Sequence, residues 1–186
     1  MNQNSSSNLR ITVYMALFTA LIIIGGYITV PIGPVPIVLA DFFVMLAGVF
    51  LGRKWGLGSV ILYAFLGAIG LPVYAGGRAG LAVIFGPTGG FLLGYLVLVF
   101  VIGFIAKEEK PSLFKSLPVL ILGKIFHFAI GIAWLKTVLN LTWEASVATG
   151  LTPFILGDTI KVVAVAAIAK ALLPRLRGTI TVKPES

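Results

Sequence analysis

The chain has 186 residues, of which 59% are hydrophobic and only 11% charged, and its mean hydropathy is +1.08. Because soluble domains carry about 25% charged residues, this composition excludes a soluble domain and indicates a single integral membrane domain. The net charge of +8 does not indicate nucleic-acid binding, since the basic residues lie mostly in short segments between apolar runs. Cysteine is absent and His127 is the only histidine, so we expect no metal and no cofactor.

Six apolar runs predict an all-α membrane protein with six transmembrane helices, because a helix needs about 20 apolar residues to cross the hydrocarbon core. The second and third runs are short, and a tight turn over residues 52–56 separates them. Short helices are tolerated where neighbouring helices enclose them. The expected spans cover about residues 11–30, 39–51, 56–71, 87–106, 117–136 and 150–173.

The distribution of lysine and arginine predicts the orientation of these spans. If the N-terminus is inside, nine basic residues fall in inner segments and two in outer ones, which matches the positive-inside rule. Both tails, residues 1–10 and 174–186, are then cytoplasmic. Lys124 and Lys170 are expected to extend toward cytoplasmic helix ends. The inner residues are Arg10, Arg53, Lys54, Lys107, Lys110, Lys115, Arg175, Arg177 and Lys183, and the outer ones are Arg78 and Lys136.

Two outer connections are apolar, although solvated loops are usually polar. Residues 31–37 contain three prolines and cannot be helical. Residues 71–81 are rich in glycine. Irregular apolar backbone near a membrane is tolerated where it is buried in protein or lines a cavity. We therefore expect these Pro/Gly-rich loops to cap a ligand pocket that opens outward.

The segment 86–90, Gly-Pro-Thr-Gly-Gly, enters the fourth predicted span and has two interpretations. Proline suits the first position of a helix, and small residues allow close helix packing. The alternative is a backbone that approaches a ligand. No phosphate-binding GxxxxGK[ST] pattern is present.

Asp158 and Lys161 are the most informative residues, because charge at membrane depth is costly and is retained mainly for function. Their spacing of three places both side chains on one helix face. Gly157 and Pro153 indicate open backbone beside them. The pair suits a neutral urea-like or amide group with both hydrogen-bond donors and an acceptor, whereas the alternatives are a structural ion pair or a proton relay.

Three further residues are candidates in the outer loops. Arg78 either contacts lipid phosphate or holds a substrate carboxylate, for which its planar guanidinium is suited. Asp41 is expected to cap the second helix; its alternative role is ligand binding. Tyr74 lies in the predicted cap and is the tyrosine that we expect to contact a ligand.

The sequence has no Ser/His/Asp set, no HExxH and no nucleotide-binding loop, so we do not expect an enzyme. Any energy for transport must come from an ion gradient or from partner proteins. Ala16 and Ala20 in the first span form a small-xxx-small pattern, which gives a smooth face for another helix.

Several segments together resemble the BioY family, the biotin-specific substrate-binding subunits of energy-coupling-factor (ECF) transporters. The resemblance extends over about residues 11–173, and the combination of Gly-Pro-Thr-Gly-Gly with Pro-Phe-x-x-Gly-Asp-x-x-Lys is specific in this order and spacing. The segments that carry it are residues 31–37, 43–52, 66–77, 86–94 and 150–161.

The resemblance implies a six-helix fold with a biotin pocket near the outer surface of a prokaryotic cell membrane. It implies that Ala16 and Ala20 dock on a transmembrane coupling subunit and that two cytoplasmic ATPases drive transport, during which the whole subunit tips in the bilayer. Asp158 and Lys161 would hold the ureido end of biotin. The loop around Gly77 and Arg78 would lie near the valerate or carboxylate, and we assign the carboxylate to Arg78 from its charge.

One segment departs from the family. Many members have a Thr-Leu-Gln run after the proline loop, whereas residues 38–41 here read Val-Leu-Ala-Asp. A contact made by that glutamine is lost or is replaced by Asp41. Two alternative functions stay open: a substrate-binding subunit for a different vitamin, and an autonomous proton-coupled carrier that uses Asp158.

Overall fold

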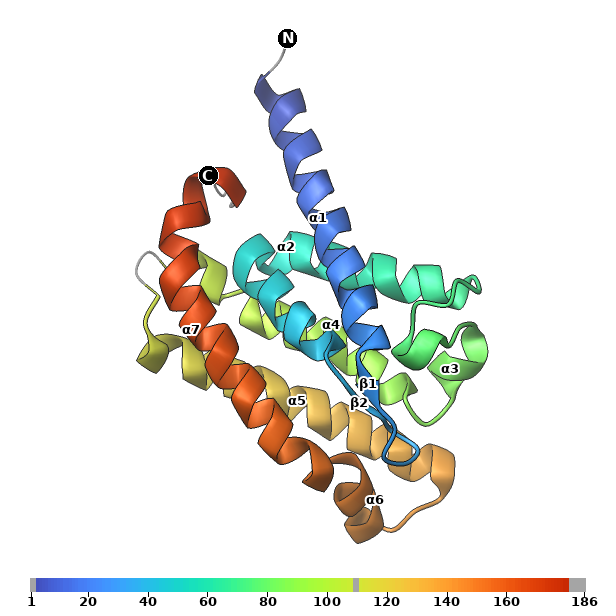
Figure 1. Ribbon diagram of the computed structural model, residues 1–186. Coiled ribbons are helices and arrows are strands. Elements are labelled where there is room, and N and C mark those ends of the chain that lie inside the picture. Colours follow the sequence, from blue (N-terminus) through green and yellow to red (C-terminus); the bar gives the residue numbers. More distant parts are fainter. Residues whose placement is uncertain (1–2, 109–110, 181–186) are drawn as a thin grey trace.

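The structure is a computed structural model that describes residues 3–108 and 111–180, and it is mainly helical (Figure 1). Within these residues, five stretches are long and apolar enough to cross a membrane, so the prediction of a helical membrane protein is confirmed. Six separate spans are not seen. The five stretches are Leu9–Tyr27, Ala40–Ala68, Gly89–Lys107, Leu113–Leu139 and Trp143–Leu176.

Helix α2 (Ala40–Ala68) replaces the predicted second and third spans and bends sharply at Gly52 (Figure 1). Gly52 has φ 73° and ψ −172°, a backbone conformation that is accessible mainly to glycine. Residues 53–56 are helical, so the expected five-residue turn is reduced to one residue. The guanidinium of Arg53 lies 5.3 Å and 4.4 Å from the ring centres of Phe100 and Phe104, which ties the bend to the end of α4 (Gly89–Ile102).

Helix α1 (Gln3–Tyr27) leads into a short hairpin that the sequence did not predict. Strand β1 (Thr29–Val30) pairs antiparallel with β2 (Ile37–Val38), and the proline-rich residues 31–36 form the turn between them. The second apolar connection contains the 3₁₀ turn η1 (Ala75–Gly77) and the short helix α3 (Leu81–Phe85). Both connections therefore have defined structure. The hairpin is held against the end of α1 by Leu39, which directly precedes α2 and whose N–H donates to the carbonyl oxygens of Gly25 and Ile28.

The core lies where α1, α2, α4, α5 (Leu113–Leu139) and α7 (Ile155–Ile180) pack together. Closely packed glycines join α4 to α5: a Cβ built on Gly90 would lie 2.2 Å from Cβ of Trp134, and one on Gly94 would lie 3.0 Å from the carbonyl oxygen of His127. Such small residues allow helices to approach where lipid supplies no hydrophobic driving force. The fully buried apolar side chains of this core include Val44, Val49, Leu98, Val99, Leu120, Val165 and Ala166.

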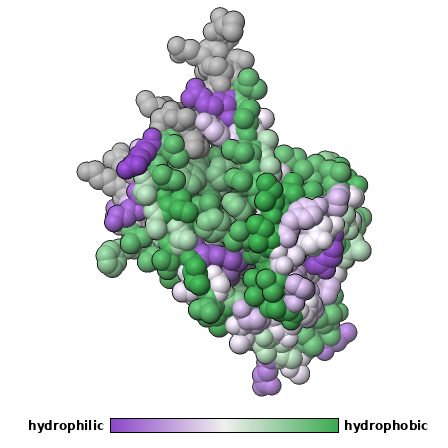
Figure 2. Space-filling view, in the orientation of Figure 1, coloured by the Kyte–Doolittle hydropathy of each residue, from purple (hydrophilic) through white to green (hydrophobic). Residues whose placement is uncertain are grey.

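The remaining elements are η2 (Ile105–Lys107), α6 (Trp143–Gly150) and η3 (Thr152–Phe154). The start of α1 and the end of α7 lie at one end of the molecule, and the β1–β2 hairpin and α6 lie at the opposite end (Figure 1). Both terminal helices continue into the segments expected to be tails. Lys110 and Lys183, which we assigned to the inner side, lie outside the described residues. Figure 2 shows a mainly hydrophobic face, with hydrophilic residues toward the two ends and smaller hydrophilic patches at mid-height.

Candidate functional site

Four charged side chains meet inside the helix bundle, and we call Asp41, Lys124, Asp158 and Lys161 the four-charge ring. Lys124 Nζ lies 2.7 Å from Asp41 Oδ2 and 2.6 Å from Asp158 Oδ2. Lys161 Nζ lies 2.7 Å from Asp41 Oδ1 and 3.1 Å from Asp158 Oδ1. Each carboxylate therefore bridges both ammonium groups, and the ring carries no net charge.

Helix positions explain how these charges are tolerated. Asp41 lies in the first turn of α2 and Asp158 in the first turn of α7, where the partial positive charge of a helix N-terminus favours a carboxylate. Lys124 comes from the middle of α5, and Lys161 follows Asp158 by three residues on α7. Removing charges from water is costly, and this cost is offset only when each charge is paired and hydrogen-bonded, as it is here.

Lys161 has a third partner besides the two carboxylates. Its Nζ donates to the carbonyl oxygen of Val38 at 2.7 Å, to Asp41 at 2.7 Å and to Asp158 at 3.1 Å. An ammonium group has three donors, so all donors of Lys161 are used within the protein. Through Val38, at the end of β2, the ring is also joined to the β1–β2 hairpin.

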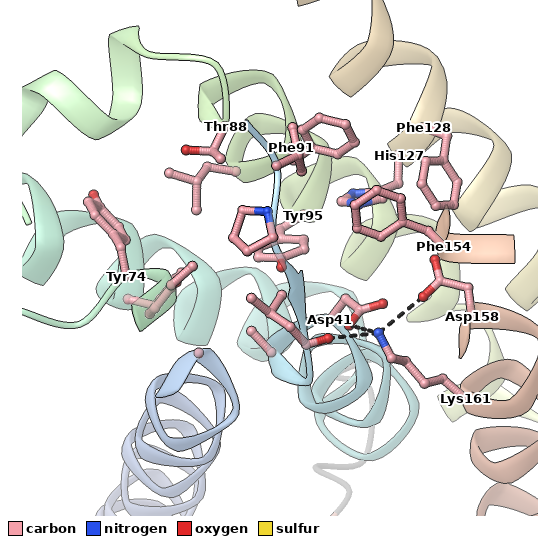
Figure 3. Close-up of a pocket in the computed structure, with 18 of the residues that line it drawn as sticks. Asp41, Tyr74, Thr88, Phe91, Tyr95, His127, Phe128, Phe154, Asp158 and Lys161 are labelled. Atoms are coloured by element: carbon pink, nitrogen blue, oxygen red, sulfur yellow. Dashed lines mark hydrogen bonds and ion pairs between the residues drawn. The ribbon is translucent and has the colours of Figure 1, made fainter. Parts of the chain in front are cut away.

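The ring forms one end of a pocket with about 620 Å³ of space, including its opening. Aromatic rings from three helices and from η3 form a large part of its wall, as Figure 3 shows. The imidazole of His127 lies parallel to the ring of Tyr95, with centroids 5.2 Å apart, and Phe128 contacts Phe154 with centroids at 6.2 Å. An apolar cavity with a few convergent polar groups is the usual form of a small-molecule site.

Tyr74 lines the same pocket on the side away from Lys161 (Figure 3). Its hydroxyl donates to the carbonyl oxygen of Ala64 at 2.6 Å, and its ring packs edge-on against Tyr63 with centroids 5.5 Å apart. Burial raises the pKa of the Tyr74 phenol, so the hydroxyl stays protonated as a donor. Its ring also lies so close to Gly67 that a Cβ there would be 2.1 Å from Cζ. Tyr74 is thus a fixed part of the wall.

A second, shallower hollow lies outside the main pocket, and we call it the outer hollow. It is formed by the β1–β2 hairpin and the η1 segment, and it shares Pro36 and Ala75 with the main pocket. Arg78 lines this hollow, is exposed, and donates from Nε to the carbonyl oxygen of Ala75 at 3.2 Å. The residues that line it are Thr29, Pro31, Gly33, Pro34, Pro36, Ala75, Gly76 and Arg78.

The structure brings together some of the predicted site residues and separates others. Asp41, Asp158, Lys161 and Tyr74 all line the main pocket. Arg78 lines only the outer hollow. Gly77 lines neither, and a Cβ built on it would lie 3.2 Å from Cε1 of Tyr27.

Two residues differ from the role that the sequence interpretation expected first. Lys124 was expected to extend toward the cytoplasmic end of its helix, and this is wrong: its side chain is 7% exposed and belongs to the ring. Asp41 was expected first as a helix cap, yet the N-terminus of α2 has no side-chain cap, and both Asp41 oxygens contact lysines. The sequence did contain a signal for Lys124. Asp41 and Asp158 both lie in predicted spans, and Lys161 alone cannot balance two buried negative charges, so a second lysine in the spans was needed.

The Gly-Pro-Thr-Gly-Gly segment has features of both expected roles, close helix packing and approach to a ligand. Gly89 and Gly90 are closely packed, since Cβ atoms built on them would lie 1.7 Å from the carbonyl oxygen of Ile84 and 2.2 Å from Cβ of Trp134. Thr88 lines the pocket, and its Oγ1 lies 3.5 Å from the carbonyl oxygen of Val83. The glycines thus serve helix packing, whereas the threonine faces the cavity.

Ala16 and Ala20 lie together on an exposed face of α1. The opposite face is buried against α2, where the Thr19 hydroxyl donates to the carbonyl oxygens of Met15 at 2.9 Å and Ser59 at 3.1 Å. The small-xxx-small face is therefore not used for packing within the described part of the chain.

Comparison with known proteins adds a family to this geometry. The BioY family model matches residues 1–178. The chain is 40% identical to the biotin transporter BioY of Thermotoga maritima, over 88% of this chain and 96% of the relative. It is 39% identical to the probable biotin transporter BioY of Pyrococcus horikoshii, over 88% and 94% of the two chains.

A solved structure agrees with these relatives. The crystal structure of the S-component for biotin from an ECF-type ABC transporter superposes with a TM-score of 0.83. The match has 36% sequence identity and covers 96% of this chain and 95% of the other. Family model, relatives and fold agree: the chain is a member of the BioY family.

Proposed function

We propose that this chain is a biotin-binding membrane subunit that captures biotin from outside and delivers it through an ATP-driven ECF transporter. The observation that carries the proposal is the pocket itself, with an aromatic, mainly apolar wall and a charged end. Biotin has matching parts: a fused apolar ring system that suits the apolar wall, and a polar urea group that suits the charged end. The named relatives are transporters and not enzymes.

In this proposal the ureido group of biotin lies at the four-charge ring. Asp158 and Asp41 accept hydrogen bonds from the two urea N–H groups. Lys161, which we expected to contact the ureido group with Asp158, instead holds both carboxylates in place, because its three donors are already used. A carboxylate oxygen can accept more than one hydrogen bond, so the pairing with lysines leaves acceptor capacity for a ligand. Tyr74 forms part of the wall for the ring system.

We propose that the valerate chain extends toward the outer hollow. The two cavities share Pro36 and Ala75 in their walls, so the outer hollow adjoins the main pocket. Arg78 is the proposed partner of the carboxylate, because a guanidinium binds carboxylates with two parallel hydrogen bonds. Gly77, with φ 77°, is proposed to shape the backbone beside it.

The membrane arrangement follows from the same proposal. Both termini are cytoplasmic, and the chain makes six passes because the two arms of α2, which meet at Gly52, each form one short pass. Neither arm reaches the about 20 residues of an ordinary span, so both depend on enclosure by the other helices. The hairpin and α6 then lie on the outer side, at the end opposite the ends of α1 and α7 (Figure 1).

Calorimetry on the purified protein in detergent tests the ligand directly. We expect saturable binding of one biotin per chain, and thermal stabilisation by biotin but not by riboflavin or thiamine. Absence of heat and of stabilisation with biotin would overturn the proposal. Stabilisation by another vitamin alone would assign the chain to a different ligand.

The proposed partners are a transmembrane coupling subunit and two cytoplasmic ATPases, with Ala16 and Ala20 as the docking face. Ala20→Trp places a bulky ring on this face, so we expect biotin uptake in cells to be lost while binding in detergent stays unchanged. Ala129→Trp on an exposed position of α5 is the matched control and should leave uptake intact. Normal uptake by Ala20→Trp would remove this face as the docking site.

A further inference from the structure

Lys124 is the member of the four-charge ring that the ligand assignment above does not use. It lies in the middle of α5, is 6% exposed, and lines the pocket. Its ammonium group contacts one oxygen of each carboxylate, Asp41 Oδ2 and Asp158 Oδ2. Lys124 and Lys161 therefore approach the two aspartates from opposite sides of the ring.

The two lysines differ in how many of their donors have acceptors. Lys161 uses three, for Val38, Asp41 and Asp158. Lys124 contacts only the two carboxylates, and its other close neighbour is the ring of Phe128, whose centroid is 5.1 Å from Nζ. Since an ammonium group carries three N–H donors, one donor of Lys124 has no acceptor in residues 3–108 and 111–180.

The carboxylates complete the pattern. Each of the four carboxylate oxygens contacts one lysine, so each retains further capacity to accept a hydrogen bond. The ring as a whole thus presents spare acceptors on Asp41 and Asp158 and one spare donor on Lys124. A urea group has the complementary set, with two N–H donors and one carbonyl acceptor.

We propose that Lys124 is a ligand-binding residue whose remaining N–H donates to the carbonyl oxygen of the bound urea group. This inference rests on the proposed function. Lys161, by contrast, is a positioning residue that anchors both carboxylates to the β1–β2 hairpin through Val38. Lys124 then determines specificity, because it requires an acceptor at the position of the carbonyl and opposes positive charge there.

The analogue 2-iminobiotin separates this role from a structural one. Its cyclic guanidine is cationic at neutral pH and has a donor where biotin has the carbonyl oxygen. We expect the wild-type protein to bind biotin at least about 100-fold more tightly, because the analogue loses a charge-assisted hydrogen bond and meets an ammonium group. Equal binding of both compounds by the wild-type protein would overturn the proposal without any substitution.

Lys124→Met provides the second measurement. Calorimetry should give biotin binding about 10- to 100-fold weaker, and the preference for biotin over 2-iminobiotin should fall at least tenfold, because the ring is left with one net negative charge. Lys170→Met, which removes an exposed lysine of α7, is the matched control and should change neither value. Unchanged biotin affinity, or equal loss for both ligands, would contradict the role of Lys124.

The double variant Asp41→Asn/Lys124→Met keeps the ring neutral if the single variant does not fold. Its preference for biotin should still be weaker than that of the wild-type protein, because the N–H donor to the urea carbonyl is missing, and a preference as strong as that of the wild-type protein would overturn the proposal. Failure of the wild-type protein to bind biotin at all is a distinct result, because it would overturn the proposed function and not the assignment of Lys124 alone.

Discussion

The four-charge ring and the outer hollow belong to adjoining cavities, yet their polar groups are held in different ways. In the ring, each charge contacts both of its opposite charges, and Asp41, Lys124 and Asp158 are buried while Lys161 is partly buried. In the outer hollow, Arg78 is exposed and has one hydrogen bond, to a carbonyl three residues before it. Paired and buried groups resist displacement, whereas an exposed guanidinium is free to move. Selectivity should therefore reside at the ring, with tolerance toward the ligand tail at the hollow.

The largest effect is expected from Asp158→Asn. The substitution removes a proposed ligand acceptor and leaves two lysines with a single carboxylate, so we expect biotin affinity to fall by roughly 100-fold or more. Calorimetry measures the loss, and Glu144→Gln on the exposed first turn of α6 is the matched control. Wild-type affinity in Asp158→Asn would show that the ring is a structural ion-pair network and not the ligand site.

An intermediate effect is expected from Gly67→Ala, which tests whether the pocket wall is rigid. The new Cβ would overlap the ring of Tyr74, which is fixed by its hydrogen bond to Ala64. Although alanine favours a helix more than glycine does, we expect the overlap to lower the free energy of unfolding by about 1–3 kcal/mol. We also expect biotin binding to be about tenfold weaker. Thermal unfolding and calorimetry measure both quantities.

Gly157→Ala is the matched control for this variant. A Cβ built on Gly157 has no neighbouring atom within 4 Å, even though the residue directly precedes Asp158. We expect unchanged stability and binding. Equal effects at the two glycines would mean that crowding of Tyr74 is not the cause.

The smallest effect is expected from Arg78→Gln. Exposed ion pairs contribute about 0.2–1 kcal/mol, so biotin binding should weaken by less than about fivefold and more at low salt than at high salt. Biotin methyl ester, which lacks the carboxylate charge, should bind equally well to both proteins. Lys136→Gln removes another basic side chain as a control. A loss at Arg78 as large as that at Asp158 would reverse the comparison.

The membrane class and the Asp158–Lys161 pair could be predicted because both depend on local sequence. A charge within an apolar run is visible without a structure, and a spacing of three places two side chains on one helix face. The proline-rich residues 31–36 were likewise expected to be irregular. The family followed from motifs in order and spacing, and the match over residues 1–178 confirms it.

The complete ring could not be predicted, because its members come from three helices that are distant in sequence. Asp41 and Lys124 are 83 residues apart, and they meet because α2 and α5 both pack against α4 and α7. Lys124 was assigned to a helix end because the expected span began at residue 117, whereas α5 begins at Leu113 and continues to Leu139. The bend at Gly52 was expected as a tight turn over residues 52–56, since sequence patterns do not reveal how few residues a change of helix direction requires.

In the proposed function, helix α1 keeps partner docking apart from ligand binding. Among the described residues it contributes Gly26 alone to the lining of the main pocket. Thr19 and Ser59 fix its inner face against α2, while Ala16 and Ala20 face outward. Substitutions on the outer face can therefore accumulate without altering the ligand site. The specificity for a partner and the specificity for a ligand could then evolve separately. Replacing the outer face of α1 with that of a relative should transfer the relative's partner specificity and leave ligand binding unchanged.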